Sequence, residues 1–130
     1  MLDAEARERV IVALDCDREE ALSLADALSG HAKWLKVGMT LYYAEGPSIV
    51  REFKDRGFKV FLDLKFHDIP HQVRGAARSA AGAGADLLSV HGLGAGAMLK
   101  AAREGAEEAA EAMGAERAKF VAITVLTSMD

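Results

Sequence analysis

The sequence predicts an α/β protein built on a parallel sheet. Short apolar runs rich in β-branched residues recur along the chain, and a helix-like stretch follows each of the first four. Their polar ends and this alternation are typical of parallel βαβ construction, since a crossover between parallel strands usually contains a helix. Five strands are predicted: Val10 to Leu14, Trp34 to Val37, Val60 to Leu64, Leu87 to Val90 and Phe120 to Leu126.

The start of the chain predicts a short amphipathic turn at residues 2–9, before the first strand. After that strand, Asp17 is expected to cap a helix, because Glu20 lies three positions later at the spacing of a capping box. Gly30 supplies a stop for this helix. The helix is expected to face its core with four apolar residues: Ala21, Leu24, Ala25 and Leu28.

Three further helices are predicted between the remaining strands. Pro47 suits the first turn of a helix that continues to Gly57, because a proline at that position loses no helical hydrogen bond. Its apolar residues are Ile49, Val50 and Phe53. The next helix begins near Pro70 and runs to Gly82, and the last spans about Ala95 to Met113, where Ala and Glu favour helix.

Composition restricts the class of protein. With 130 residues, of which 51% are hydrophobic, the chain can bury one core, so a single domain is expected. The net charge of −4 argues against general nucleic-acid binding, which needs a basic face. No span approaches the roughly 20 apolar residues that cross a bilayer. Cys16 is the single cysteine, and a soluble cytoplasmic protein is expected.

The length leaves two architectures open. An eight-unit barrel needs about 200–250 residues. The 130 residues therefore correspond either to a small five-stranded open sheet or to part of a larger barrel.

Polar residues close the predicted strands, where parallel α/β proteins bind their ligands. Asp63 and Lys65 lie two positions apart in the segment that closes the third strand, so alternation predicts that they share a face. Together with Lys36 they could form an ionic array, either as a structural ion pair or as preorganised charges. In the second case a lysine donates a proton and a carboxylate repels an anionic substrate group.

The run from Phe61 to Pro70 contains Asp63-x-Lys65-x-x-Asp68 followed by Ile69-Pro70, and it resembles the signature of orotidine 5′-phosphate decarboxylases. The agreement extends to four other segments: Ala13-Leu14-Asp15, Leu35-Lys36-Val37-Gly38, Val90-His91-Gly92 and Val125-Leu126-Thr127-Ser128-Met129. The resemblance implies a (β/α)8 TIM barrel, of which this chain holds about the first five strands and four helices. Residues 1–130 would form a partial barrel domain that stops after the fifth strand.

The resemblance also implies a role for each matching residue. Lys65 would donate a proton to C6 of the pyrimidine, while Asp63 and Lys36 complete the charged network. Asp68 would act in the site of a neighbouring subunit, because the family builds its sites at a homodimer interface. The substrate-binding residues would be Asp15, Lys36, Ile69, His91, Thr127 and Ser128. The reaction would convert orotidine 5′-phosphate to UMP, in pyrimidine biosynthesis, without a cofactor or a metal.

Other polar and glycine-rich segments have simpler interpretations. His67 and His71 flank Asp68 and could suggest a metal site. Pro70 disfavours helix at the residue before it, however, so the two imidazole rings need not share a helical face. The glycines at 92, 94 and 96 resemble a phosphate-binding loop only loosely. The acidic residues of the last helix are expected to form a solvated surface: Glu104, Glu107, Glu108 and Glu111.

Three alternatives remain. The first is a Mg²⁺-dependent sugar-phosphate decarboxylase or aldolase of the same barrel group. Such an enzyme requires an acidic ligand for the metal just after the second strand, where Gly38-Met39-Thr40 offers none. A phosphoacceptor signalling domain would use Asp15, Asp17 and Asp63, but it expects a lysine where Thr127 and Ser128 stand. The third is a half-barrel without catalysis. The isolated chain is expected to be weakly active or inactive and to have an exposed strand edge.

Overall fold

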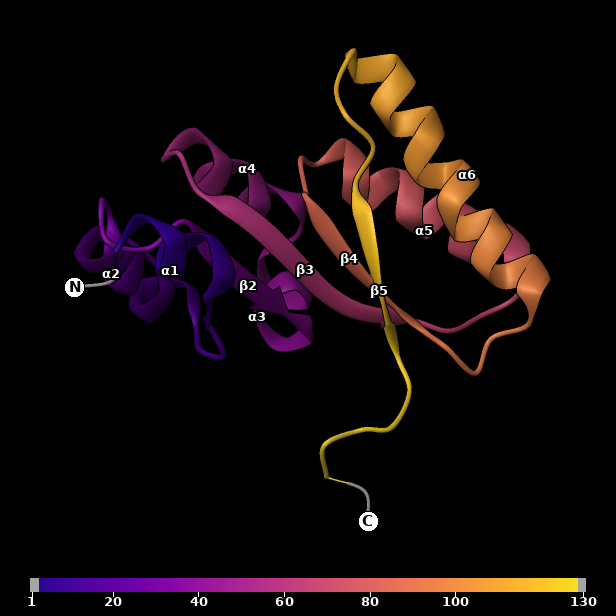
Figure 1. Cartoon of the computed structure of the whole chain (residues 1–130), viewed down its shortest axis with the longest axis horizontal. Helices are drawn as coiled ribbons and strands as arrows, with labels where there is room; N and C mark the ends of the chain where they lie inside the picture. The colour runs from indigo at the N-terminus through magenta and orange to yellow at the C-terminus, as the bar shows by residue number, and fades with distance from the viewer. Residues whose placement is uncertain (1–2, 129–130) are drawn as a thin grey trace. The chain divides into compact units, whose positions relative to one another are not determined.

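The computed structural model describes residues 3–128 (Figure 1). The helices are α1 (Ala4–Arg9), α2 (Arg18–Leu28), α3 (Met39–Glu45), α4 (Pro47–Asp55), α5 (Pro70–Gly82) and α6 (Gly96–Met113). The strands are β1 (Ile11–Ala13), β2 (Trp34–Gly38), β3 (Lys59–Phe66), β4 (Leu87–His91) and β5 (Lys119–Ile123). They follow one another in a five-stranded sheet in the order β1-β2-β3-β4-β5. A parallel sheet with alternating helices is therefore confirmed.

The chain divides into two compact units. The first comprises the residues up to Asp63 together with Ala83–Ala85, and the second comprises Leu64–Gly82 and the residues from Asp86 onward. The division falls inside β3, after Asp63. The expectation of one domain stays a prediction.

In the first unit, β2 pairs in parallel with β1 and with β3, and the pairing places Lys36 between Ala13 and Phe61. Leu35 and Val37 are fully buried, whereas the alternate positions of β2 are half-buried, so one side of these strands carries the apolar core. The core of this unit also contains Ala21 and Ala25 of α2. From α4 it contains Ile49, Val50 and Phe53.

In the second unit, β4 pairs in parallel with β5, from Leu87 opposite Lys119 to His91 opposite Ile123. Helices α5 and α6 lie side by side (Figure 1). Their packing against β4 forms a buried cluster of Val73, Ala77, Val90, Met98 and Ala102, with Phe66 and Phe120 at its margin. The alanine stripes of both helices allow this close approach.

The helix caps agree with the sequence signals. The side chain of Asp17 accepts a hydrogen bond of 2.9 Å from the backbone N–H of Glu20, as the capping-box spacing predicts. Gly30 adopts a φ of 80° just after α2, and Pro47 begins α4. Helix α1 covers most of the predicted amphipathic turn, of which residue 2 lies outside the described residues.

Two expectations were wrong, and one helix was missed. The fifth strand ends at Ile123 rather than Leu126, and Val125 is 62% exposed. β5 pairs with β4, and the last pair of residues is His91 and Ile123. The N–H of Gly92 still donates to the Ile123 carbonyl, but the pairing of the two strands ends there. Leu24 is 39% exposed, because α2 packs through the small stripe of Ala21 and Ala25 instead. Helix α3 was not predicted.

Candidate functional site

Three charged residues meet in the first unit, close to the carboxyl ends of β1 and β2. Asp15 follows β1, Lys36 lies in β2 and Asp63 lies in β3. The Nζ atom of Lys36 lies 3.8 Å from Oδ2 of Asp15 and 3.7 Å from Oδ2 of Asp63. One ammonium therefore stands between carboxylates from the two neighbouring strands. We call these three residues the acid–lysine–acid array.

The strand pairing explains why these side chains converge. Ala13 pairs with Lys36, and Gly38 pairs with Asp63. Paired residues of parallel strands project to the same side, so the array shares the face opposite the apolar core. A Cβ atom at residue 38 would lie 3.2 Å from Oδ1 of Asp15, so glycine leaves room for this carboxylate.

Burial differs among the three charges. Asp63 is buried, the Lys36 side chain is 24% exposed, and the Asp15 side chain is 69% exposed. Burying a charge is costly unless it is paired, and the ammonium of Lys36 supplies Asp63 with such a partner. The neighbouring Cys16 is no candidate nucleophile, because desolvation and the carboxylates of Glu20, Asp17 and Asp15 raise the pKa of its thiol.

Lys65 follows in the second unit, and its backbone is unusual. Its φ of 52° is the single positive value among the non-glycine residues of the described chain. Alternation along β3 assumes extended backbone and therefore does not give the direction of this side chain. The backbone N–H of Lys65 donates a hydrogen bond of 2.9 Å to Oγ of Ser89 in β4. The expected place of the lysine beside Asp63 stays a prediction.

The segment between β3 and α5 carries Asp68 and Ile69, both of which are exposed. Oδ1 of Asp68 accepts a hydrogen bond of 2.6 Å from the N–H of Ile69. Just before them, the ring of His67 lies 4.8 Å from the ring of His91, which ends β4. His91 is half-buried, and its Nδ1 atom is buried without a hydrogen-bond partner.

Thr127 and Ser128 lie in a turn beyond the end of β5, and both are exposed.

The glycine-rich segment after β4 is explained in part by packing. A Cβ atom at residue 92 would lie 3.3 Å from the Ile123 carbonyl oxygen, and one at residue 94 would overlap the end of the Met98 side chain.

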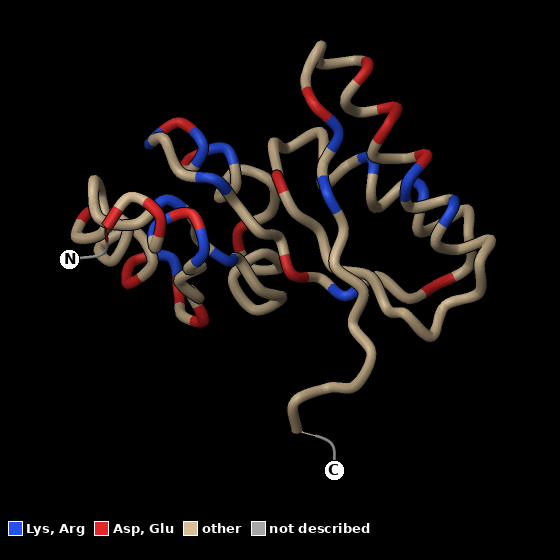
Figure 2. Tube along the Cα trace, in the orientation of Figure 1, with Lys and Arg blue, Asp and Glu red and all other residues tan. Residues whose placement is uncertain are grey.

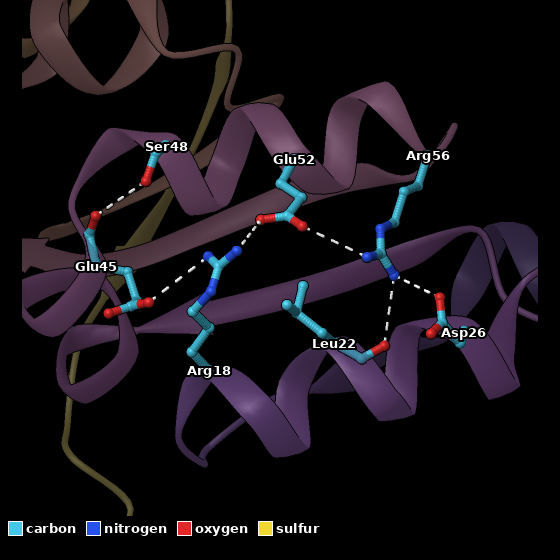
Figure 3. A network of polar contacts seen from close by, with 7 residues as sticks. All are labelled: Arg18, Leu22, Asp26, Glu45, Ser48, Glu52 and Arg56. Carbon is cyan, nitrogen blue, oxygen red and sulfur yellow. Dashed lines mark hydrogen bonds and ion pairs between the residues drawn. The ribbon is translucent and has the colours of Figure 1, made fainter.

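Other charges in the first unit stabilise helices rather than form a site. Arg18 of α2 pairs with Glu45 and Glu52, and Arg56 pairs with Glu52 and Asp26 (Figure 3). This alternating network ties α2 to α4. Basic and acidic residues are interspersed along the trace of both units (Figure 2).

Two kinds of feature are absent from residues 3–128. No three His, Cys, Asp or Glu side chains in this range are placed to hold a metal ion. No helix in it is both long and apolar enough to cross a membrane.

Sequence reasoning missed two residues that shape the site. Gly38 lies against the Asp15 carboxylate, but its pattern in the sequence gives no sign of this contact. Ser89 did leave a signal, because a lone polar residue inside the apolar run Leu87-Leu88-Ser89-Val90 needs a hydrogen-bond partner once it is buried.

Similar proteins share both the sequence and the fold of this chain. The orotidine 5′-phosphate decarboxylase of Maridesulfovibrio salexigens is 53% identical over 122 residues, which are 93% of this chain and 52% of that protein. The orotidine 5′-phosphate decarboxylase of Nitratidesulfovibrio vulgaris is 49% identical over 120 residues, 92% of this chain and 51% of that protein. The chain thus spans about half the length of the curated relatives it matches.

A solved structure shows the same arrangement of elements. The crystal structure of orotidine 5′-phosphate decarboxylase from Lactobacillus acidophilus matches with a TM-score of 0.85 at 38% identity, covering 93% of this chain and 55% of that one. The expected fold is therefore confirmed, with the five parallel strands forming part of a TIM barrel. Since a sequence model described as "Orotidine 5'-phosphate decarboxylase / HUMPS family" matches residues 8–130, the chain belongs to that family.

Proposed function

We propose that the intact protein decarboxylates orotidine 5′-phosphate to UMP in pyrimidine biosynthesis. The observation that carries this proposal is the acid–lysine–acid array close to the carboxyl ends of β1 and β2, with Lys65 two residues beyond Asp63. Family membership supports the same reaction.

In the proposed reaction the bond between C6 and the carboxyl carbon breaks and CO₂ leaves. The electron pair of that bond stays on C6. An ammonium fixed near C6 stabilises charge that is present only in the transition state and the carbanion-like product. Lys65 then gives its proton to C6, which completes UMP. Asp63 repels the substrate carboxylate, while Lys36 balances the charge of Asp63.

The other matching residues would bind the substrate. Asp15 would hydrogen-bond the ribose, Lys36 would contact the substrate from the charged network, and Thr127 and Ser128 would contact the ribose or the pyrimidine. Ile69 and His91 would line the pocket. We further propose that the intact protein is a cytoplasmic homodimer in which Asp68 reaches the site of the partner subunit, and that its reaction needs no cofactor or metal.

The direct test is an assay of the purified intact protein with orotidine 5′-phosphate, following UMP and CO₂ with and without EDTA. Turnover that persists in EDTA is expected, because the proposed proton donor and charge stabilisers are side chains. No UMP from a folded protein would overturn the proposal. Loss of turnover in EDTA that Mg²⁺ restores would favour the metal-dependent reaction of a sugar-phosphate type enzyme.

A further inference from the structure

Lys65 adopts a backbone conformation that a residue with a side chain rarely occupies. Its φ of 52° lies in the left-handed region, where the Cβ atom crowds the backbone. Such a conformation persists only where the surrounding structure holds it, and it recurs at functional sites. The structure around Lys65 must therefore hold its backbone in place.

Ser89 makes such a contact with Lys65. It lies in the middle of β4, is fully buried, and accepts the backbone N–H of Lys65 at 2.9 Å through its hydroxyl oxygen. A side-chain oxygen thus binds an amide at a point where a regular ladder would use a backbone carbonyl.

The support beneath this hydroxyl is rigid. Leu88 and Val90, on either side of Ser89, are buried, and Val90 belongs to the cluster between β4, α5 and α6. On the β5 side, Ser89 pairs with Val121. A hydroxyl anchored in this way fixes the position of the amide that it binds.

We propose that Ser89 is a positioning residue for the reaction: its hydroxyl holds Lys65 in the left-handed conformation and so sets the direction in which the ammonium leaves β3. This inference rests on the proposed function, in which Lys65 supplies the proton. Without the hydroxyl, the lysine backbone relaxes toward the extended conformation, which sends the side chain elsewhere. The ammonium is then misplaced, although substrate contacts made by other residues remain.

The experiment compares Ser89→Ala, Ser89→Thr and Val90→Ala in the intact protein, measuring kcat and KM with orotidine 5′-phosphate. Ser89→Ala should lower kcat by about 10- to 100-fold, the effect of a displacement near 1 Å, with KM nearly unchanged. Ser89→Thr keeps the hydroxyl and should keep more of kcat. Val90→Ala is the control, because it loosens the same strand without touching the hydrogen bond and should lower thermal stability while preserving kcat.

Amide hydrogen exchange at Lys65, measured by NMR, tests the hydrogen bond without relying on activity or on a well-packed threonine. Faster exchange at Lys65 in folded Ser89→Ala, but not in Val90→Ala, is the expected result. Unchanged exchange in Ser89→Ala would overturn the inference, as would an unchanged kcat or equal losses of kcat in Ser89→Ala and Val90→Ala. An unsubstituted protein that makes no UMP would refute the proposed function instead, and the exchange result would still decide whether Ser89 holds Lys65.

Discussion

At the scale of residues, the array is held together by one half-buried ammonium with two anionic neighbours. Lys36 approaches Asp15 and Asp63 at 3.8 and 3.7 Å, which are ion-pair distances rather than those of short charge-assisted hydrogen bonds. The arrangement leaves the ammonium able to shift toward a ligand. Asp15, the more exposed partner, is the one that a substrate hydroxyl can engage most readily.

Gly38→Ala tests whether the position of Asp15 matters. The new Cβ atom would lie 3.2 Å from Oδ1 of Asp15, so the exposed carboxylate is expected to move away and lose the contact with the ribose that we propose for it. We expect KM for orotidine 5′-phosphate to rise several-fold, about 1 kcal/mol of binding, with a smaller change in kcat. Steady-state kinetics of the intact protein measure both constants.

The control for this substitution is Gly82→Ala, where a Cβ atom meets nothing within 4 Å. It should leave KM unchanged. A Gly38→Ala protein with wild-type KM would show that Asp15 does not contact the substrate in the way proposed.

At the scale of elements, the contact between α5 and α6 depends on one glycine. A Cβ atom at residue 105 would lie 2.2 Å from the Arg74 carbonyl oxygen, so alanine there must push the helices apart. We expect Gly105→Ala to lower the free energy of unfolding by about 1–3 kcal/mol, the usual cost of overpacking. Denaturant unfolding of the intact protein measures it.

Gly75→Ala on α5 is the matched control, because a Cβ atom there meets nothing within 4 Å. It should stabilise the protein by about 0.5–1 kcal/mol, since alanine favours helix over glycine. Equal stabilities of the Gly105→Ala and Gly75→Ala proteins would contradict the close packing of the two helices.

The same pair of helices carries an ionic contact that depends on pH. The hydrogen bond from the Arg74 guanidinium lowers the pKa of Glu108 below its usual value. A lowered carboxyl pKa contributes stability that is present above the pKa of the unfolded chain and is lost as the pH falls through the folded value. The stability advantage of the unchanged protein over Glu108→Gln should therefore be present at pH 7 and disappear in acid.

Thermal unfolding between pH 7 and pH 3 measures this effect, which should be small because the contact is exposed. Glu111→Gln, at an exposed position of the same helix, serves as the control and should follow the unchanged protein. An advantage over Glu108→Gln that stays constant with pH would contradict the account.

Periodic patterns predicted most helices and strands, because the residues that begin, end and orient these elements lie close together in the sequence. The cap at Asp17, the proline that begins α4 and the alternating burial of β2 each follow from a few neighbouring residues. The end of β5 could not be predicted, since the apolar run continues to Leu126 and only the partner strand stops it. The left-handed backbone of Lys65 likewise depends on a strand 24 residues away.

The acidic face of α6 is solvated as expected, but it also contacts α5. Glu107 and Glu111 are exposed as expected, but Glu104 and Glu108 pair with Arg74 of α5. Helical spacing identifies the polar side of a helix, and it does not show that a second helix brings basic residues to that side.

At the scale of the whole molecule, the chain spans about half the length of its curated relatives. Residues outside this span would supply part of the substrate contacts, and remote binding contributes to the transition state as well as to affinity. We expect a protein consisting of residues 1–130 alone to have little or no decarboxylase activity. Assays beside the intact protein, at equal concentration, measure the difference.

The same 130-residue protein should associate with itself. Its terminal strands β1 and β5 each have one neighbour in the sheet, and an open strand edge pairs readily with another chain. Sedimentation velocity over a range of concentrations measures its mass. A stable, fully active monomer would contradict both expectations.

The central proposal is that Lys65 delivers the proton to C6 of the substrate. The most direct measurement is kcat of the Lys65→Ala variant of the intact protein with orotidine 5′-phosphate, with folding checked by circular dichroism. We predict a loss of about 10²–10⁴-fold or more, as expected when a proton donor and its charge are removed together. A folded Lys65→Ala protein that turns over near the wild-type rate would contradict the account.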